Sequence, residues 1–178
     1  SCCAPCSSYT IEYLSNYFKI AVLYYNPNIS PREEYEKRKA EQIRLIQSLP
    51  VQNKVNFVDC DYDCNAFFEI AKGYEQCREG GERCFRCYEL RLRKAAEEAK
   101  KGGYDYFCTT LSISPLKNAQ KINEIGERLS EAYSVLWLPS DFKKREGYKR
   151  SIELSKEYNL YRQNFCGCVY SRREAEHE

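Results

Sequence analysis

Eleven cysteines in 178 residues constrain this chain more than any other feature. Seven of them form three groups that lie far apart: Cys2-Cys3-Ala4-Pro5-Cys6, Cys84-Phe85-Arg86-Cys87 and Cys166-Gly167-Cys168. Two cysteines separated by one or two residues can give two ligands to one metal or cluster. Three such groups therefore predict a fold that brings distant segments together around metal.

The kind of metal is argued from the number and spacing of the cysteines. An iron–sulfur cluster takes four thiolates. Zinc is the alternative, but zinc ribbons use two pairs about 15–20 residues apart and would leave the third group over. A thioredoxin-like redox motif explains only one pair. The pattern favours iron–sulfur, with the surplus cysteines either binding a second metal or acting as redox-active thiols.

The composition fits one domain, residues 1–178, with 43% hydrophobic residues and a net charge of +2. That charge predicts neither a nucleic-acid nor a membrane partner, and no apolar run approaches the roughly 20 residues that span a bilayer. No export leader precedes the odd number of cysteines, so we expect a reducing, cytoplasmic location. The chain contains no Met, and we expect that a strand before the first cysteine group has been trimmed.

The sole histidine, His177, lies in a charged segment, 172–178, that we expect to be a flexible tail without a chemical role. A Ser-His-Asp triad or histidine-based zinc catalysis is therefore excluded.

Apolar runs alternate with amphipathic patterns along the chain, which predicts strands alternating with helices. The strands are expected at 19–25, 54–59, 104–108 and 134–138, and the helices at 31–49, 63–71, 84–100, 117–133 and 146–158. Ser30 is expected to cap the first of these helices, with Pro31 as its first residue. The alternation predicts an α/β fold, a Rossmann-like parallel sheet flanked by helices, with the metal site at the carboxyl ends of its strands.

The remaining cysteines stand outside the three groups, and we interpret them as small core residues. They are Cys60, Cys64, Cys77 and Cys108.

The ordered motifs of this chain resemble those of a known family, the cobalamin-independent epoxyqueuosine reductases of the QueH type. The resemblance covers nearly the whole chain and rests on Cys2 to Cys6, 25–29, 61–63, 81–84, Cys87-Tyr88, 109–115, 141–144, Gly147-Tyr148, 161–164 and Cys166 to Cys168. It implies a [4Fe–4S] cluster with a separate iron beside it. It also implies the two-electron deoxygenation of the epoxide of epoxyqueuosine in tRNA. An external ferredoxin- or flavodoxin-like protein is expected to supply the electrons.

Within this reading, the expected metal ligands are Cys2, Cys3, Cys6, Cys84, Cys87, Cys166, Cys168 and Asp61. Cys84 and Cys87 open a predicted helix, where the dipole favours thiolates, so we assign both to the cluster. Asp61 is the first choice for a carboxylate on the second iron and Asp59 the second, because oxygen ligands suit iron. The residues expected to act in catalysis are Asp61, Tyr25, Tyr62 and Asp141.

Substrate contacts are expected from side chains that pair with bases or phosphates. Asn26 and Asn28 suit hydrogen bonds to the modified base, although Asn-Pro-Asn is also ordinary turn chemistry. Lys143, Lys144 and Arg162 suit phosphates and Tyr148 suits base stacking, and Lys117, Arg145, Lys149 and Arg150 are further basic candidates. The alternative function is a zinc-stabilised RNA-binding module without catalysis. A tRNA-modifying enzyme of the ATP-activating type is disfavoured because no Gly-rich phosphate loop follows the first strand.

Overall fold

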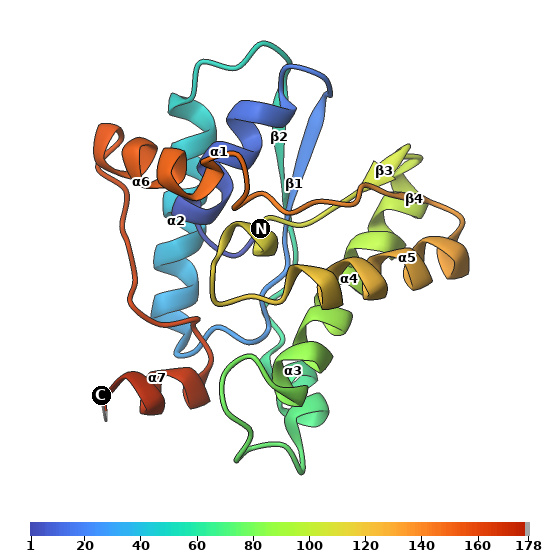
Figure 1. Ribbon diagram of the computed structural model, residues 1–178, viewed down its shortest axis with the longest axis vertical. Coiled ribbons are helices and arrows are strands. Elements are labelled where there is room, and N and C mark those ends of the chain that lie inside the picture. The colour runs from blue at the N-terminus through green and yellow to red at the C-terminus, as the bar shows by residue number, and fades with distance from the viewer. Residues whose placement is uncertain (177–178) are drawn as a thin grey trace.

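The computed structural model describes residues 1–176, which form a mixed α/β structure (Figure 1). Its strands are β1 (Ile20–Tyr24), β2 (Val55–Asp59), β3 (Tyr106–Phe107) and β4 (Leu136–Trp137). Each lies within a range that the sequence predicts. The strands pair in parallel, β1 with β2 and β3 with β4.

The hydrogen bonds of the described strands form two two-stranded sheets rather than the one sheet that the alternation predicts. A cavity of about 440 Å³ opens between β1 and β3, with α1 and α4 as its other walls. Its lining is mainly apolar and includes Val22, Leu23, Leu92 and Phe107. Because this space separates β1 from β3, the backbone groups of the two strands do not pair.

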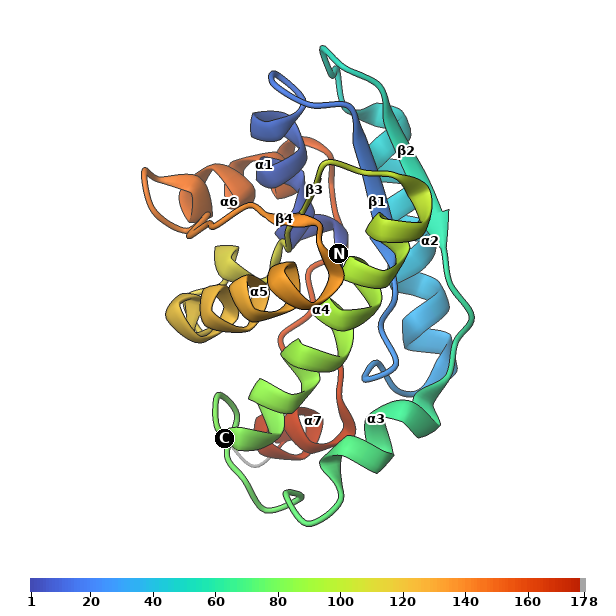
Figure 2. The same ribbon diagram turned by 90° about the vertical axis from the view of Figure 1, so that its right-hand side faces the viewer.

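The helices carry most of the described chain. Their bounds are α1 (Ala4–Leu14), α2 (Arg32–Ser48), α3 (Cys64–Ala71), α4 (Glu82–Gly102), α5 (Ala119–Tyr133), α6 (Gly147–Glu157) and α7 (Val169–Glu176), with a short 3-10 helix, η1 (Leu111–Ile113). The helix α2 lies on one side of β1 and β2, and α4 lies on the other (Figure 1). Figure 2 shows α3, α7 and the start of α4 together at one end of the molecule.

The helix α4 follows directly from its sequence. Glu82 lies in its first turn, where a negative charge suits the helix dipole, and Gly103 ends it in the left-handed conformation with φ of 65°. Tyr88 and Leu92 are buried on the same face and pack with Ile122 and Leu129 of α5. This apolar face fixes α4 against α5 and so positions the first two turns of α4, which carry Cys84 and Cys87.

The helix α1 was not predicted from the sequence. Its buried positions include Ser7, Ser8 and Thr10, so it has no continuous apolar stripe. Pro5 in the first turn is the local signal for a helix start. The helix packs beside α6, and Glu12 pairs with Arg150 of α6 at 2.6 Å.

Two smaller expectations need correction or comment. The predicted cap of α2 is wrong, because Pro31 is the N-cap and the Ser30 amide instead donates to the carbonyl oxygen of Gly167 at 2.9 Å. The segment expected as a flexible tail lies in α7 as far as Glu176, while His177 and Glu178 lie outside the described residues. Among the described helices, none combines the length and the apolar character needed to span a bilayer.

Candidate metal centre

The fold gathers the three cysteine groups into two sets. Cys2, Cys3 and Cys6 lie at the start of α1, and their sulfur atoms are all within 4.8 Å of one another. We call these residues the trio. The second set, the quartet, lines one small cavity of about 20 Å³ and consists of Cys84, Cys87, Cys166 and Cys168. Helix α4 supplies two quartet members, and the turn before α7 supplies the other two.

Hydrogen bonds among its thiols organise the trio. The thiols of Cys3 and Cys6 hold the pKa of Cys2 well below its usual value, because they donate to its thiolate and nearby Arg91 adds positive charge. The hydrogen bond with Cys2 raises the pKa of Cys3 to about 12, and the hydrogen bonds with Cys2 and Cys3 raise the pKa of Cys6 well above its usual value. A bound metal ion would displace the thiol protons of the trio, because metals bind cysteines as thiolates.

Donors from three different segments surround the quartet. The Gly80 amide donates to the Cys84 sulfur at 3.2 Å, and the Ser171 amide donates to the Cys168 sulfur at 3.4 Å. The Lys117 ammonium donates to the Cys166 sulfur at 3.3 Å. Burial raises the pKa of Cys84 and Cys168 and raises that of Cys87 to about 12. Three of the four quartet sulfurs thus meet donors suited to an anion, which fits metal-bound thiolates.

Arg91 connects the two cysteine sets. It lies one turn after Cys87 on α4, and it donates to the side-chain oxygen of Asn26 at 2.8 Å. Burial lowers the pKa of Arg91, but Cys87, Cys2 and Cys166 raise it by more, so the net direction is upward. Cys2 belongs to the trio and the other two to the quartet, so one guanidinium balances negative charge from both sets.

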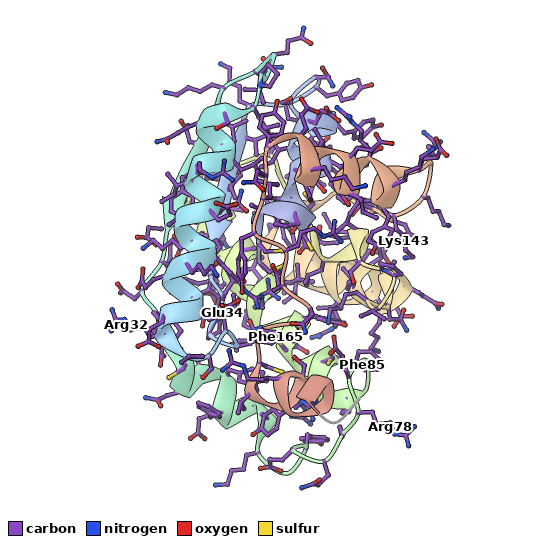
Figure 3. All side chains as sticks on the ribbon, turned by 90° about the vertical axis from the view of Figure 1, so that its left-hand side faces the viewer. Arg32, Glu34, Arg78, Phe85, Lys143 and Phe165 are labelled. Carbon is purple, nitrogen blue, oxygen red and sulfur yellow. The ribbon has the colours of Figure 1, made fainter. Side chains whose placement is uncertain are left out.

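The turn at Cys166-Gly167-Cys168 depends on α2. Arg38 donates to the carbonyl oxygen of Cys166 at 2.9 Å and is itself paired with Glu34 at 2.6 Å. Gly167 has φ of +117°, and a Cβ there would lie 2.9 Å from the Arg38 side chain. Figure 3 shows Glu34 beside α2 and Phe165 on the segment that leads to α7, whereas Arg32 and Arg78 lie at the edge of the molecule.

The two predicted asparagines lie deep in the structure. Asn26 is 1% exposed, and its amide nitrogen donates to the Ser1 carbonyl while its oxygen accepts from Arg91. Asn28 is buried beside the quartet, and its side-chain oxygen has no hydrogen-bond partner among the described residues. Asn28 therefore has a free acceptor at the cavity, whereas Asn26 is fully used inside the protein. Their binding to substrate stays a prediction.

The predicted catalytic residues are distributed around the site. Asp61 is exposed, in the segment between β2 and α3, and is not part of the trio. Tyr62 donates to the carbonyl oxygen of Ile29 at 2.8 Å. Tyr25 is partly buried, and burial raises its pKa. Asp141 pairs with Lys143 at 2.6 Å and with Lys144 at 3.7 Å. Their roles in catalysis stay predictions.

The basic and aromatic residues expected to meet substrate differ in exposure. Lys144 and Arg162 are exposed, and Tyr148 is exposed to 37%. Lys143 lies toward the rim of the molecule (Figure 3). Lys117 departs from the expectation of a phosphate contact, because its side chain is buried against Glu79 and Cys166.

The cysteines outside the three groups are all free thiols. None of them lines the quartet cavity or belongs to the trio. Cys108 lines the larger cavity instead.

Sequence reasoning missed the buried cations that hold the site together. Arg91 had a usable signal, because it lies four residues after Cys87 and so shares its helix face. Arg38 had none, since it contacts a residue 128 positions away.

Fold and site together define the class of protein: a mixed α/β chain with a candidate metal centre built from cysteines of three distant segments. A family model described as "Epoxyqueuosine reductase QueH" matches residues 1–174. The chain belongs to the epoxyqueuosine reductase QueH family.

Relatives that carry the name "Epoxyqueuosine reductase QueH" match almost all of the chain. The Streptococcus pyogenes protein is 44% identical over 172 residues, covering 96% of this chain and 68% of the relative. The Staphylococcus epidermidis protein is 45% identical over 177 residues, covering 96% and 74%. The Thermotoga maritima protein is 36% identical over 170 residues, covering 96% and 86%.

Proposed function

We propose that this chain reduces the epoxide of epoxyqueuosine in tRNA to give queuosine. The observation that carries the proposal is the convergence of seven cysteines, as trio and quartet, in a chain of the QueH family. In the overall reaction the substrate takes up two electrons and two protons. Both carbon–oxygen bonds of the epoxide break, a carbon–carbon double bond forms, and the oxygen leaves as water.

The cysteines fit the two proposed metal groups by number and by surroundings. The quartet offers the four thiolates that a [4Fe–4S] cluster takes. The trio is a set of close sulfur atoms suited to a separate iron, with Asp61 retained as a candidate oxygen ligand. When bound, these groups supply single-electron transfer and Lewis acidity.

The protein's own contribution to the site is to balance charge and to restrict water. Thiolates packed in a protein interior need cationic partners, since a buried unpaired charge is costly. Arg91 and Lys117 supply positive charge beside the sulfur atoms, and both are 8% exposed. The same packing keeps bulk water from the cavity while backbone amides of Gly80 and Ser171 orient two of the sulfurs.

Proton delivery and substrate binding are assigned to the predicted residues. The candidate acids are Tyr25, Tyr62 and Asp141, and burial raises the pKa of the Tyr25 phenol. Asn28, with its free acceptor, suits a donor group on the modified base. The proposed contacts to the tRNA are Lys143, Lys144, Arg162 and Tyr148. Asn26 accepts a hydrogen bond from Arg91 and so helps to hold its guanidinium in place.

The electrons are proposed to come from an external ferredoxin- or flavodoxin-like donor. A reducing cytoplasmic setting suits the free state of all eleven cysteines.

The proposal is tested by anaerobic reconstitution with iron and sulfide, followed by incubation with a chemical reductant and tRNA that contains epoxyqueuosine. Nucleosides from the digested tRNA are then separated and identified by mass. We expect a brown protein with about four sulfides per chain, and conversion of epoxyqueuosine to queuosine. A fully loaded protein that leaves the epoxide intact would defeat the catalytic proposal.

A matched pair of variants distinguishes the cysteines of the candidate metal centre from the other cysteines. Cys77→Ala changes a thiol outside both sets and should leave iron content and turnover unchanged, whereas Cys168→Ala should reduce both at least tenfold. A chain that binds zinc without sulfide and binds tRNA without turnover would instead support the zinc-stabilised RNA-binding module.

A further inference from the structure

Lys117 is a buried cation at the wall of the quartet cavity. Its side chain is only 7% exposed, although lysine is almost never fully buried without a partner. The ammonium lies 3.3 Å from the Cys166 sulfur and 2.6 Å from a carboxylate oxygen of Glu79. Both hydrogen-bond partners of the ammonium belong to the protein itself, so the lysine serves the site from within.

Glu79 is the second part of this arrangement. It lies in the segment between α3 and α4, far from Lys117 in sequence, and its side chain is 23% exposed. The ammonium is therefore shared between a sulfur ligand on its inner side and a carboxylate nearer to solvent. Both partners accept hydrogen bonds from the ammonium, so the surroundings of Lys117 suit a positively charged side chain.

Fixed charges and hydrogen bonds at the sulfur atoms are the protein's main means of setting the potential of an iron–sulfur site. A positive charge beside the sulfurs stabilises the reduced form, which carries one more negative charge, and a nearby negative charge has the opposite effect. These effects are strong in a protein interior, where water screens little.

We propose that Lys117 raises the reduction potential of the metal centre held by Cys166, and that Glu79 offsets part of this increase. The pair thus sets how readily the centre accepts an electron. This inference deepens the proposed function and rests on it only in requiring a redox-active metal at the quartet.

The test measures the midpoint potential of the reconstituted protein by a redox titration monitored by electron paramagnetic resonance. Lys117→Met removes the positive charge and should shift the potential to a more negative value. Glu79→Gln removes the opposing carboxylate and should shift the potential to a more positive value, by less because Glu79 is partly solvated. Lys117→Arg keeps the charge and should stay close to the unchanged protein.

Two further variants sharpen the comparison. Lys121→Met removes an exposed lysine that pairs with Glu124 on the first turn of α5, and it should not move the potential. In the double variant Lys117→Met with Glu79→Gln, the Glu79 substitution should have a smaller effect than it has alone, because its partner is gone.

Opposite shifts from Lys117→Met and Glu79→Gln establish the proposal, since a general loosening of the site would move both in one direction. Unchanged potentials, or shifts of the same sign, overturn it. If Lys117→Met fails to hold iron, the sign of the Glu79→Gln shift decides. A chain without any redox-active metal overturns the inference together with the proposed cofactors. A redox-active chain that leaves epoxyqueuosine intact defeats only the proposed reaction, because the potentials are measured without substrate.

Discussion

At the scale of single residues, the turn that presents Cys166 and Cys168 depends on the missing side chain of Gly167. An alanine there would combine a strained φ of +117° with a Cβ placed 2.9 Å from Arg38 and 3.0 Å from Ile29. Gly73 has a positive φ of 81°, but no atom lies within 4 Å of the Cβ that an alanine would add there. Gly73→Ala therefore measures the cost of the backbone conformation without a steric clash.

We therefore expect Gly167→Ala to lower the free energy of unfolding by about 3 kcal/mol and Gly73→Ala by about 1 kcal/mol. Urea unfolding of the metal-free proteins gives both values. Iron content after reconstitution should fall for Gly167→Ala alone. Equal losses of stability with full iron content in both variants would contradict this account of the turn.

Cys108 gives a residue-scale prediction about pH. Burial raises the pKa of its thiol from 9.0 to about 11, so the folded protein keeps this proton longer than the unfolded chain. The resulting stability is fully present below pH 9 and is lost as the pH rises through 11. Relative to Cys108→Ala, the metal-free protein should lose about 1 kcal/mol of unfolding free energy between about pH 8 and about pH 10.

Urea titrations of both proteins at the two pH values check this prediction. Both proteins contain the same tyrosines and the same other cysteines, so the contributions of these groups to the pH dependence of the unfolding free energy cancel in the comparison. A difference between the proteins that stays constant with pH would show that Cys108 keeps an ordinary pKa.

At the scale of elements, the contact between α5 and β4 requires a glycine. A Cβ on Gly126 would lie 2.3 Å from the ring of Trp137, which is buried and hydrogen-bonded to Asn123. Gly102, in the last turn of α4, offers a matched position, because the nearest side chain there is the exposed Tyr104, which can move.

The same substitution should therefore have opposite effects at these two sites. Gly126→Ala should reduce the free energy of unfolding by about 1–3 kcal/mol through overpacking. Gly102→Ala should leave it unchanged or raise it by up to about 1 kcal/mol through better helix propensity. Thermal unfolding followed by circular dichroism distinguishes the outcomes, and equal changes at both sites would refute the packing argument.

The elements also mark where sequence reasoning succeeds. Helices α2 to α6 and all four strands could be predicted because their apolar residues recur with the period of the element. Helix α1 could not, since small polar residues such as Ser7 and Ser8 form its buried face. Helix α7 could not either, because its sequence is mostly charged and its packing comes through Tyr170 against α3 and α4.

The site shows the same division. Its cysteines were recognisable from spacing, because one or two intervening residues place two sulfurs near one metal. Their separation into trio and quartet required the fold. So did the buried partners Arg38, Arg91 and Lys117, whose contacts cross between segments distant in sequence.

At the scale of the whole molecule, the cavity between β1 and β3 bears on the strand expected before the first cysteine group. The Ser1 amine already donates to the Leu23 carbonyl at 2.8 Å, so the chain enters along the open side of β1. We propose that a strand preceding Ser1 in a longer chain would lie in this cavity, pair with β1 and β3, and join the two sheets into one parallel sheet. That sheet would be the Rossmann-like arrangement that the alternation of elements predicts.

An extension of about six alternating apolar residues before Ser1 tests this proposal, since that is the usual strand length. We expect the melting temperature to rise by several degrees and the amides of β1 and β3 to exchange hydrogen more slowly. A proline at the centre of the same extension cannot donate a backbone hydrogen bond to a neighbouring strand. That extension should therefore give neither effect. Equal behaviour of the two extensions would contradict the proposal.

The convergence of three distant cysteine groups has a consequence for how long the chain survives. A cluster held by the quartet, as proposed, would join α4 to the segment before α7 and close the long loop between Cys87 and Cys166, and so would remove chain entropy from the unfolded state, much as a disulfide does. Loss of the cluster through oxidation would release this loop and expose the backbone to proteases. The amount of intact protein in a cell would then follow its iron supply, so that turnover of the chain itself reports the state of the site.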